Sequence, residues 1–269
     1  MNINLCLRRG LVALCLVSAC DDGAAADSDR TGEIISNLLE AGYPRDDLDV
    51  DDDGRVTVQG DIAMSLRASR EQRAPQTRFR QYFTTNKVAR CNRAIKVLVD
   101  EDLDAEFRAR VAEALVVWNS VGSGLSFSLT DEFGEQDVWI WGSNEPLAPG
   151  VLALSLPPEG GLPGESIAVG PLLLSQSPRF QKHTMIHEIG HTVGLRHTDF
   201  NSRASCSKRE NEGAGDVGAE WIEGTSVAHP SDTQSPDPLS MFNACSSRTA
   251  PPIVFSPDDV LAILTVYPR

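Results

Sequence analysis

Three histidines and a glutamate form the most chemically informative group in the chain. They lie in the segment His187-Glu188-Ile-Gly-His191-Thr-Val-Gly194-Leu-Arg-His197. Residues four apart on a helix share one face, so His187 and His191 can direct their imidazoles at one metal ion, with bonds of about 2 Å. Gly194 permits a sharp turn after the helix, and this turn would bring His197 round as a third ligand.

This ligand set predicts catalysis rather than a purely structural metal. Three neutral imidazoles leave one coordination position for water, which is the pattern of catalytic zinc sites. Zinc lowers the pKa of that water, and Glu188 is placed to take its proton and to pass it to the leaving amine after attack on a peptide carbonyl. We therefore predict a zinc-dependent endopeptidase with Glu188 as its base. Metal binding without catalysis is the alternative.

The elements that must position these residues can be read from local patterns. Ser177-Pro178 is a cap followed by proline at the first helical position, so a helix is expected from there to about residue 193. Alternation and apolar runs predict strands at 94–99, 125–129, 138–141, 151–156 and 167–174, and helices over about 60–72, 103–120 and 256–266.

The motif HExxHxxGxxH resembles the signature of the metzincin zinc metalloproteases. The segment Pro238–Asn243 is similar to that family's methionine turn, with Met241 as the matching methionine. The segments around Trp118 and from Ser256 to Tyr267 resemble two helices of the matrix metalloproteinase branch, so the resemblance covers about residues 90–269. The interval from His197 to Met241 is longer than in that branch, and the chain looks like a bacterial, matrixin-like secreted protease.

The resemblance implies an α/β metzincin fold. Its sheet would be twisted and mostly parallel with one antiparallel edge strand, and it would carry two long helices, one of them the zinc helix, and an irregular C-terminal subdomain. The strand at Val151–Leu156 would be that edge strand, to which an extended peptide substrate can add. Protein or peptide substrates are the partners expected on this basis.

The N-terminus has the pattern of an export signal. Arg8 and Arg9 precede an apolar stretch from Leu11 to Ala19 that is too short to span a bilayer. Val17-Ser-Ala-Cys20 reads as a bacterial lipobox, with Cys20 as the lipid anchor; an ordinary signal peptide is the alternative. The predicted organisation is a lipoprotein signal at 1–19, a flexible tether at 20–30, an accessory or pro-segment at 31–77 and the protease domain at 78–269.

Charge narrows the range of partners. The formal net charge of −14 argues against nucleic acid or an anionic membrane surface, because both require a basic patch. Membrane contact is expected only through the N-terminal lipid, so the predicted location is the bacterial cell envelope or the exterior.

Three cysteines remain after removal of the signal and lipidation of Cys20. One pair and one free thiol is the simplest count, and we pair Cys206 with Cys245 because both lie in the Gly/Ser/Asp-rich region after residue 198. Cys91 could then be a switch residue that binds the metal in a latent form, or a structural or disulfide-bonded cysteine.

The segment 31–77 leaves its role open. Asp49, Asp51 and Asp53 with Gly54 match the start of an EF-hand calcium loop, but the twelfth position is Gly60 instead of glutamate, so a solvated acidic turn is the competing interpretation. Three hypotheses follow for the whole chain: an active endopeptidase, a latent zymogen covered by its N-terminal unit, and a non-catalytic surface lipoprotein that uses a zinc-binding domain to bind proteins.

Overall fold

The computed structural model describes most of the chain from residue 23 onward. The described residues are 23–40, 43, 45, 48–58, 60–72, 83–84, 86–148, 150–199, 203, 205–206, 222, 225, 237 and 239–269. The predicted signal peptide and Cys20 lie outside them. Within them no helix combines the length and apolar character needed to cross a membrane.

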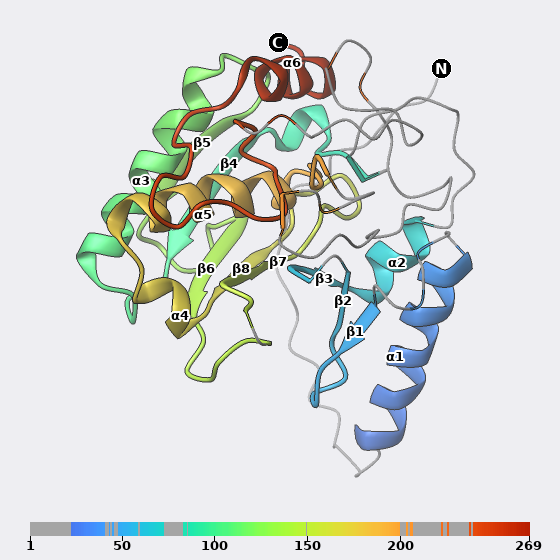
Figure 1. Cartoon of the computed structure of the whole chain (residues 1–269). Helices are drawn as coiled ribbons and strands as arrows, with labels where there is room; N and C mark the ends of the chain where they lie inside the picture. Colours follow the sequence, from blue (N-terminus) through green and yellow to red (C-terminus); the bar gives the residue numbers. More distant parts are fainter. Residues whose placement is uncertain are drawn as a thin grey trace, which may run out of the picture.

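In the part of the chain that the structure describes, one mixed sheet of eight strands organises the fold (Figure 1). Its spatial order is β1-β2-β3-β7-β8-β6-β4-β5. The strands are β1 (Leu48–Val50), β2 (Val56–Val58), β3 (Ile62–Met64), β4 (Ala94–Val99), β5 (Ser126–Thr130), β6 (Val138–Gly142), β7 (Ala153–Ser155) and β8 (Ser166–Val169).

The predicted sheet is confirmed, with one change at its edge. Strands β5, β4, β6 and β8 pair in parallel, and β7 joins β8 antiparallel. The expectation that β7 forms the open edge is wrong for the whole chain, because β3 pairs with it in parallel, with Ile62 opposite Ser155. The N-terminal meander β1-β2-β3 thus extends the sheet beyond the strand expected to receive a substrate.

Two long helices, α3 (Ala105–Ser120) and α5 (Pro178–Thr192), pack against each other, and α5 crosses the sheet in front of its parallel strands (Figure 1). The side chains of Asp104 and Ser177 accept hydrogen bonds from backbone N–H groups in the first turn, and the cap at Ser177 is the one that the sequence predicts. The indole Nε1 of Trp118 donates to the carbonyl of Ile186 at 3.0 Å and fixes the two helices relative to each other.

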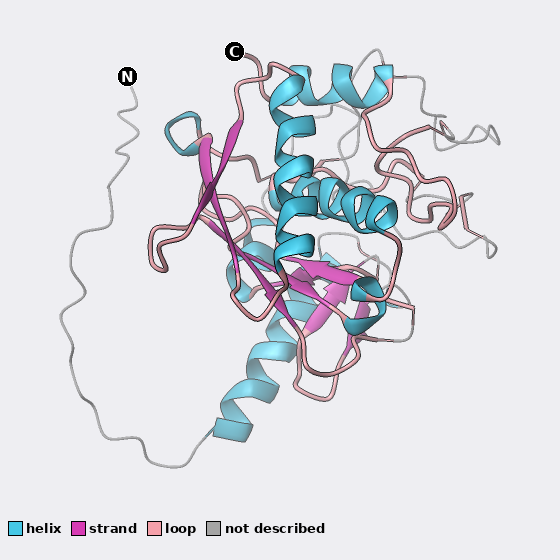
Figure 2. Ribbon diagram, turned by 90° about the vertical axis from the view of Figure 1, so that its left-hand side faces the viewer, coloured by secondary structure: helices cyan, strands magenta, loops and turns pink. Residues whose placement is uncertain are grey.

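The N-terminal unit has a hydrophobic core of its own. Helices α1 (Gly23–Glu40) and α2 (Leu66–Gln72) accompany its three strands, and Figure 2 shows the long helix standing away from the main body. Its buried apolar residues are Ile34, Leu38, Tyr43, Val56, Val58, Ile62, Met64 and Ala68. Every member of the larger cluster, in contrast, lies at Phe83 or later.

Three local predictions differ from the structure. Helix α1 begins at Gly23, inside the segment expected to be a tether up to residue 30. The strand expected over 167–174 ends at Val169, because Pro171 starts the short helix α4 (Pro171–Leu174). The helix expected over 60–72 is divided into β3 and α2.

The acidic segment Asp49–Gly54 forms the hairpin between β1 and β2. One carboxylate oxygen of Asp51 accepts hydrogen bonds from the backbone N–H groups of Asp53 and Arg55, at 3.1 and 2.8 Å. Gly54 takes a positive φ of 75°, which suits glycine. The turn therefore uses its aspartate to satisfy its own backbone, as the solvated-turn interpretation expects.

Candidate metal and catalytic site

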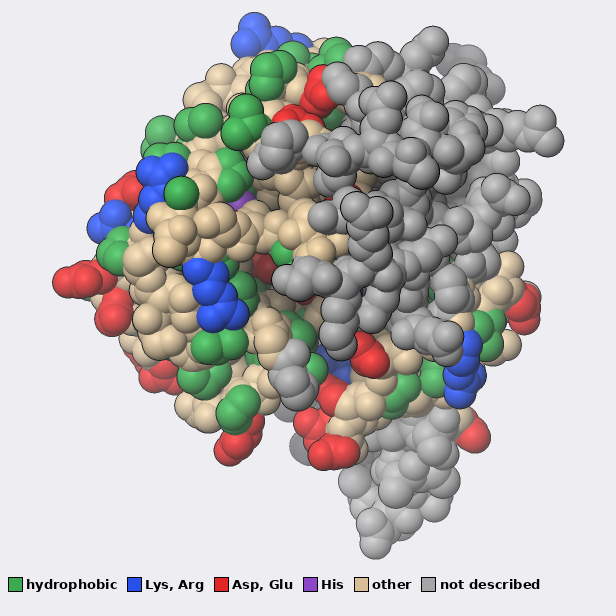
Figure 3. Space-filling view, viewed as in Figure 1, with side chains coloured by type: hydrophobic (Ala, Val, Ile, Leu, Met, Phe, Trp, Pro, Cys, Tyr) green, Lys and Arg blue, Asp and Glu red, His purple; other side chains and the backbone are tan. Residues whose placement is uncertain are grey.

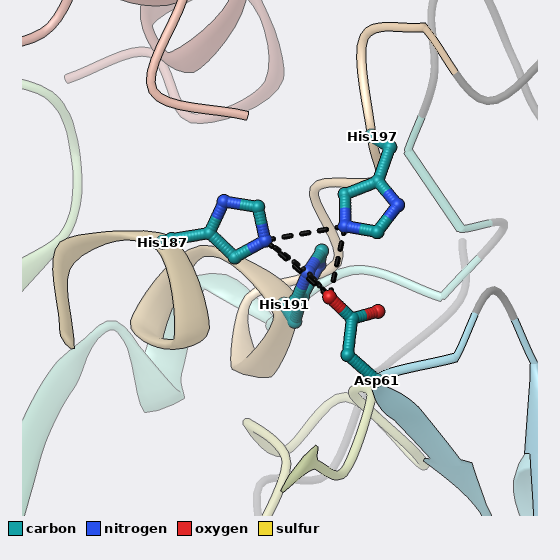
Figure 4. A group of neighbouring side chains, drawn as sticks. All are labelled: Asp61, His187, His191 and His197. Atoms are coloured by element: carbon teal, nitrogen blue, oxygen red, sulfur yellow. Dashed lines mark hydrogen bonds and ion pairs between the residues drawn. The ribbon is translucent and has the colours of Figure 1, made fainter. Parts of the chain in front are cut away.

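Helix α5 and the turn after it bring the three predicted histidines together. The Nε2 atom of His187 lies 2.9 Å from that of His191 and 3.2 Å from that of His197. All three side chains are buried. The convergence follows from the four-residue spacing on the helix and from the reversal of the chain before His197 (Figure 4).

Gly194 makes this reversal possible. Its φ is +91°, and an added Cβ would lie 2.9 Å from the backbone oxygen of Asn86 and from the hydroxyl of Thr84. A side chain is thus disfavoured both by conformation and by space. The backbone N–H of Leu195 returns to the carbonyl of Gly190 at 2.9 Å and closes the helix end.

A fourth group, Asp61, was not among the residues predicted for the site. It precedes β3 in the N-terminal unit, and its Oδ2 lies 2.9 Å from Nε2 of His197 and 3.6 Å from Nε2 of both other histidines. Figure 4 shows its carboxylate pointing into the space between the three rings. No sequence signal distinguishes Asp61 from the other acidic residues, which number 38 with it.

The chemistry of this cluster fits a divalent cation. Nδ1 of His187 lies 2.8 Å from the carbonyl of Met241 and Nδ1 of His191 2.7 Å from that of Leu195, so these nitrogens donate and the Nε2 atoms present lone pairs. Lone pairs that face one another and a carboxylate repel unless a cation lies between them. The ligand atoms of a tetrahedral zinc ion are about 3.3 Å apart, close to the distances found here.

The electrostatics favour the protonation states that zinc requires. Burial lowers the pKa of His191 to about 4, so its imidazole is neutral near neutral pH. Burial alone would raise the pKa of Asp61, but the neighbouring histidines hold it well below its usual range. The second oxygen of Asp61 is buried without a hydrogen-bond partner among the described residues. Metal ligands must be deprotonated, and the pKa shifts of His191 and Asp61 meet this requirement.

Glu188 lies beside the cluster but is not part of it. It is buried, and the hydroxyl of Ser155 on β7 donates to its Oε2 at 2.5 Å. Burial, followed by the negative charge of Asp61, raises the pKa of Glu188 to about 7. A carboxyl group in such surroundings can exchange a proton near neutral pH.

Met241 lies beneath the histidines, where the resemblance places a methionine turn. It is fully buried, and its carbonyl is the one that holds His187. The turn is itself held by α6 (Pro257–Val266), because Oδ2 of Asp259 accepts from the backbone N–H of Met241 at 2.8 Å. The ring of Phe242 lies against that of His187, with centroids 6.0 Å apart.

The cysteines differ in part from their predicted arrangement. Cys206 and Cys245 form the predicted pair, with their Cα atoms 5.1 Å apart. Cys91 is also disulfide-bonded in the full chain; the prediction of one free thiol concerns the chain after loss of the signal and lipidation of Cys20, and it stays a prediction. The group that faces the three histidines from the N-terminal side is Asp61, and this takes the place that the switch hypothesis gave to Cys91.

The described surface in Figure 3 shows acidic and basic side chains in small separate groups and no continuous basic area. This agrees with the acidic net charge of −14.

Comparison with known proteins identifies a peptidase family. A family model described as a dual-action HEIGH metallo-peptidase, Peptidase_M57, matches residues 56–267. The match begins within the N-terminal unit and includes Asp61 together with the histidines. No curated protein matches the chain.

Solved structures of low similarity were also found. A crystal structure of myroilysin has a TM-score of 0.40 at 20% identity, over 65% of this chain and 83% of that one. A hatching enzyme zinc-protease from Oryzias latipes (Medaka fish), high choriolytic enzyme 1, has a TM-score of 0.36 at 12% identity, over 65% of this chain and 88% of that one.

Proposed function

Because the chain belongs to the family of HEIGH metallo-peptidases, we propose that it is a zinc-dependent endopeptidase whose ligands are His187, His191 and His197. The observation that carries the proposal is the convergence of three Nε2 atoms from these residues, two of them oriented by backbone carbonyls. The recognition of a metzincin-like zinc metallopeptidase from its motif is confirmed by the family match. Placement in the matrixin-like branch remains a prediction.

Glu188 is the proposed general base. Zinc, when bound, supplies Lewis acidity that polarises the substrate carbonyl and acidifies water. The Glu188 carboxylate takes a proton from the attacking water and hands it to the nitrogen of the leaving amine. Burial raises its pKa, which suits a group that must accept and release a proton in one cycle.

The substrate is proposed to bind as an extended strand along β7. In the full chain this edge is covered, since the backbone N–H of Ser155 donates to the carbonyl of Asp61 at 3.0 Å and Ile62 pairs with Ser155. A peptide that adds to the sheet needs these same groups. Substrate and N-terminal unit therefore compete for one edge.

The same competition supports the hypothesis of a latent zymogen over the hypothesis that the full chain is an active endopeptidase. Asp61 lies against all three proposed ligands and takes the place that water needs. We propose that the full chain is latent and that displacement of Asp61 activates it. The calcium hypothesis stays a prediction, and the backbone hydrogen bonds that Asp51 accepts within its hairpin favour the solvated turn.

The decisive experiment compares four full-length proteins: wild type, Asp61→Ala, Glu188→Ala and the double variant. Zinc content is measured by elemental analysis and cleavage with casein and a quenched-fluorescence peptide library. Expected is zinc at one equivalent in all four, cleavage by Asp61→Ala well above wild type, and none in either protein that lacks Glu188. Full zinc with no cleavage by Asp61→Ala, even at high peptide concentration, would favour the non-catalytic binding protein.

The N-terminal segment carries a separate proposal on location. Its basic start, its apolar stretch and Cys20 support export and lipid attachment in a bacterial envelope. Growth with a labelled fatty acid should label the wild type and not Cys20→Ala. Equal labelling of the two proteins, or none in either, would contradict lipid attachment at this residue.

A further inference from the structure

Ser155 contacts the proposed base from the substrate side of the site. It lies on β7 and is fully buried. Its hydroxyl oxygen is 2.5 Å from Oε2 of Glu188 and 3.2 Å from the backbone oxygen of the same residue. A hydroxyl that donates to a carboxylate forms a short, charge-assisted hydrogen bond.

The backbone and the side chain of Ser155 serve two different partners. In a strand, the backbone N–H lies in the plane of the sheet while the side chain stands roughly perpendicular to it. The N–H of Ser155 accordingly binds the neighbouring strand, at the carbonyl of Asp61, while the hydroxyl crosses to helix α5. One residue thus joins the strand edge that a substrate would use to the carboxylate that would act on it.

We propose that Ser155 is a positioning residue for Glu188, an inference that rests on the proposed function. The terminal torsion of a glutamate is broad, so its two oxygens have no fixed direction without a partner. The hydroxyl holds Oε2 and leaves Oε1 as the oxygen that takes the proton. Ser155 itself touches neither water nor substrate with its side chain; it acts through Glu188.

A purely structural role would have different consequences from this one. If the hydroxyl only satisfied a buried carboxylate, its loss would lower stability and leave turnover by the folded enzyme unchanged. If it positions the base, its loss lowers kcat. KM changes little in either case, because the backbone N–H of residue 155 remains in place to bind the substrate strand.

The test uses full-length protein that carries Asp61→Ala, in which the proposed obstruction is removed. In this background the remaining N-terminal strand competes with peptide and raises KM, but it does not affect turnover at saturation. Ser155→Ala and Ser155→Thr are added separately. Thr184→Val is the matched control. Thr184 lies on α5, as Glu188 does, and its buried hydroxyl donates to the carbonyl of Phe180 at 3.0 Å.

We expect Ser155→Ala to lower kcat about 10- to 100-fold, since a small misplacement of a catalytic group costs up to about 100-fold. KM should stay within threefold and zinc content at one equivalent. Ser155→Thr should recover at least half of the lost turnover if its melting shows it folded, and Thr184→Val should match the parent.

A kcat within twofold of the parent for Ser155→Ala at full zinc would overturn the proposal, provided that Glu188→Ala abolishes cleavage in the same background. If the Asp61→Ala parent does not cleave at all, and Glu188→Ala is indistinguishable from it, the proposed function fails and the positioning role falls with it. The behaviour of Glu188→Ala therefore separates the two failures.

Discussion

Replacing Asp259 with alanine should both destabilise the fold and weaken zinc binding, although Asp259 touches no metal ligand. This carboxylate is buried at the start of α6 and joins three groups. Its Oδ1 accepts from the hydroxyl of Ser240 at 2.6 Å, and its Oδ2 accepts from the backbone N–H groups of Met241 and Ser256, at 2.8 and 3.0 Å. It therefore holds the methionine turn and closes the capping box of the helix.

The size of the effect follows from these bonds. Hydrogen bonds to charged groups contribute about 1.5–3 kcal/mol each, and the two N–H groups would be left buried without partners. Burial raises the pKa of Asp259, so desolvation of the charge already offsets part of this gain. We expect a loss near the low end, about 3 kcal/mol for Asp259→Ala and about 1 kcal/mol for Asp259→Asn, which keeps the shape and one acceptor.

Zinc binding should weaken because the turn continues into the site. The carbonyl of Met241 accepts from Nδ1 of His187, and this bond orients the ring that presents Nε2. Loss of a group that orients a metal ligand typically costs about 10- to 100-fold in metal affinity. The expected order of zinc affinities is wild type, then Asp259→Asn, then Asp259→Ala.

The assays are urea unfolding in the presence of a chelator, for stability, and competition with a fluorescent zinc chelator, for affinity. Asp104→Ala is the matched control: Asp104 caps α3, not α6, through the backbone N–H of Phe107, at 2.7 Å. It should lose about 1 kcal/mol and keep its zinc affinity. Equal weakening of zinc binding in the Asp104 and Asp259 variants, or a loss below 1 kcal/mol in Asp259→Ala, would refute the reasoning.

Three further changes have defined outcomes. Tyr267→Phe deletes the buried hydroxyl that donates to the carbonyl of Val193 and should cost about 1–3 kcal/mol in urea unfolding without loss of zinc; an unchanged midpoint would contradict this. Gly190→Ala places a Cβ 2.2 Å from Cε1 of Phe242 and should lower the thermal midpoint by the equivalent of about 1–3 kcal/mol, whereas a neutral result would mean that the turn shifts freely. Burial lowers the pKa of His183 to about 4. As the pH falls below 6.5, His183 therefore binds a proton in the unfolded chain before it does so in the folded protein. The free energy of unfolding should decline by up to about 3 kcal/mol towards pH 4. Unfolding free energies against pH for His183→Gln should show a shallower decline, and identical slopes would refute the assignment.

The sequence was sufficient wherever a residue's position depends on its immediate neighbours. On a helix, the four-residue spacing of His187 and His191 places both side chains on one face. Gly194 ends that helix in a left-handed conformation, which reverses the direction of the chain. The caps at Ser177 and Ser256 lie where a hydroxyl followed by proline predicts them. The mostly parallel sheet was predicted from the family resemblance.

Asp61 and Ser155 could not be found in this way. Asp61 is 136 residues from His197 in sequence, and nothing in the pattern around it differs from other acidic turns. Ser155 lies in an apolar strand, and nothing in the surrounding sequence marks this serine as a site residue. Both enter the site through the pairing of β3 with β7, and such pairing depends on the three-dimensional packing of two units rather than on local spacing.

The proposed latency is consistent with the division of the apolar core into two separate clusters. Asp61 belongs to a unit whose buried apolar residues end at Ala68, whereas the helices and strands that hold the histidines share a cluster that begins at Phe83. In the sheet the two units meet at one residue pair, Ile62 with Ser155. Separation of the two units would expose the edge of β7 and free the three Nε2 atoms, whereas the bonds from Met241 and Leu195 that orient the rings lie within the larger unit. A blocking group supplied by the catalytic core itself would lack this property, because its removal would disturb the packing that positions the ligands.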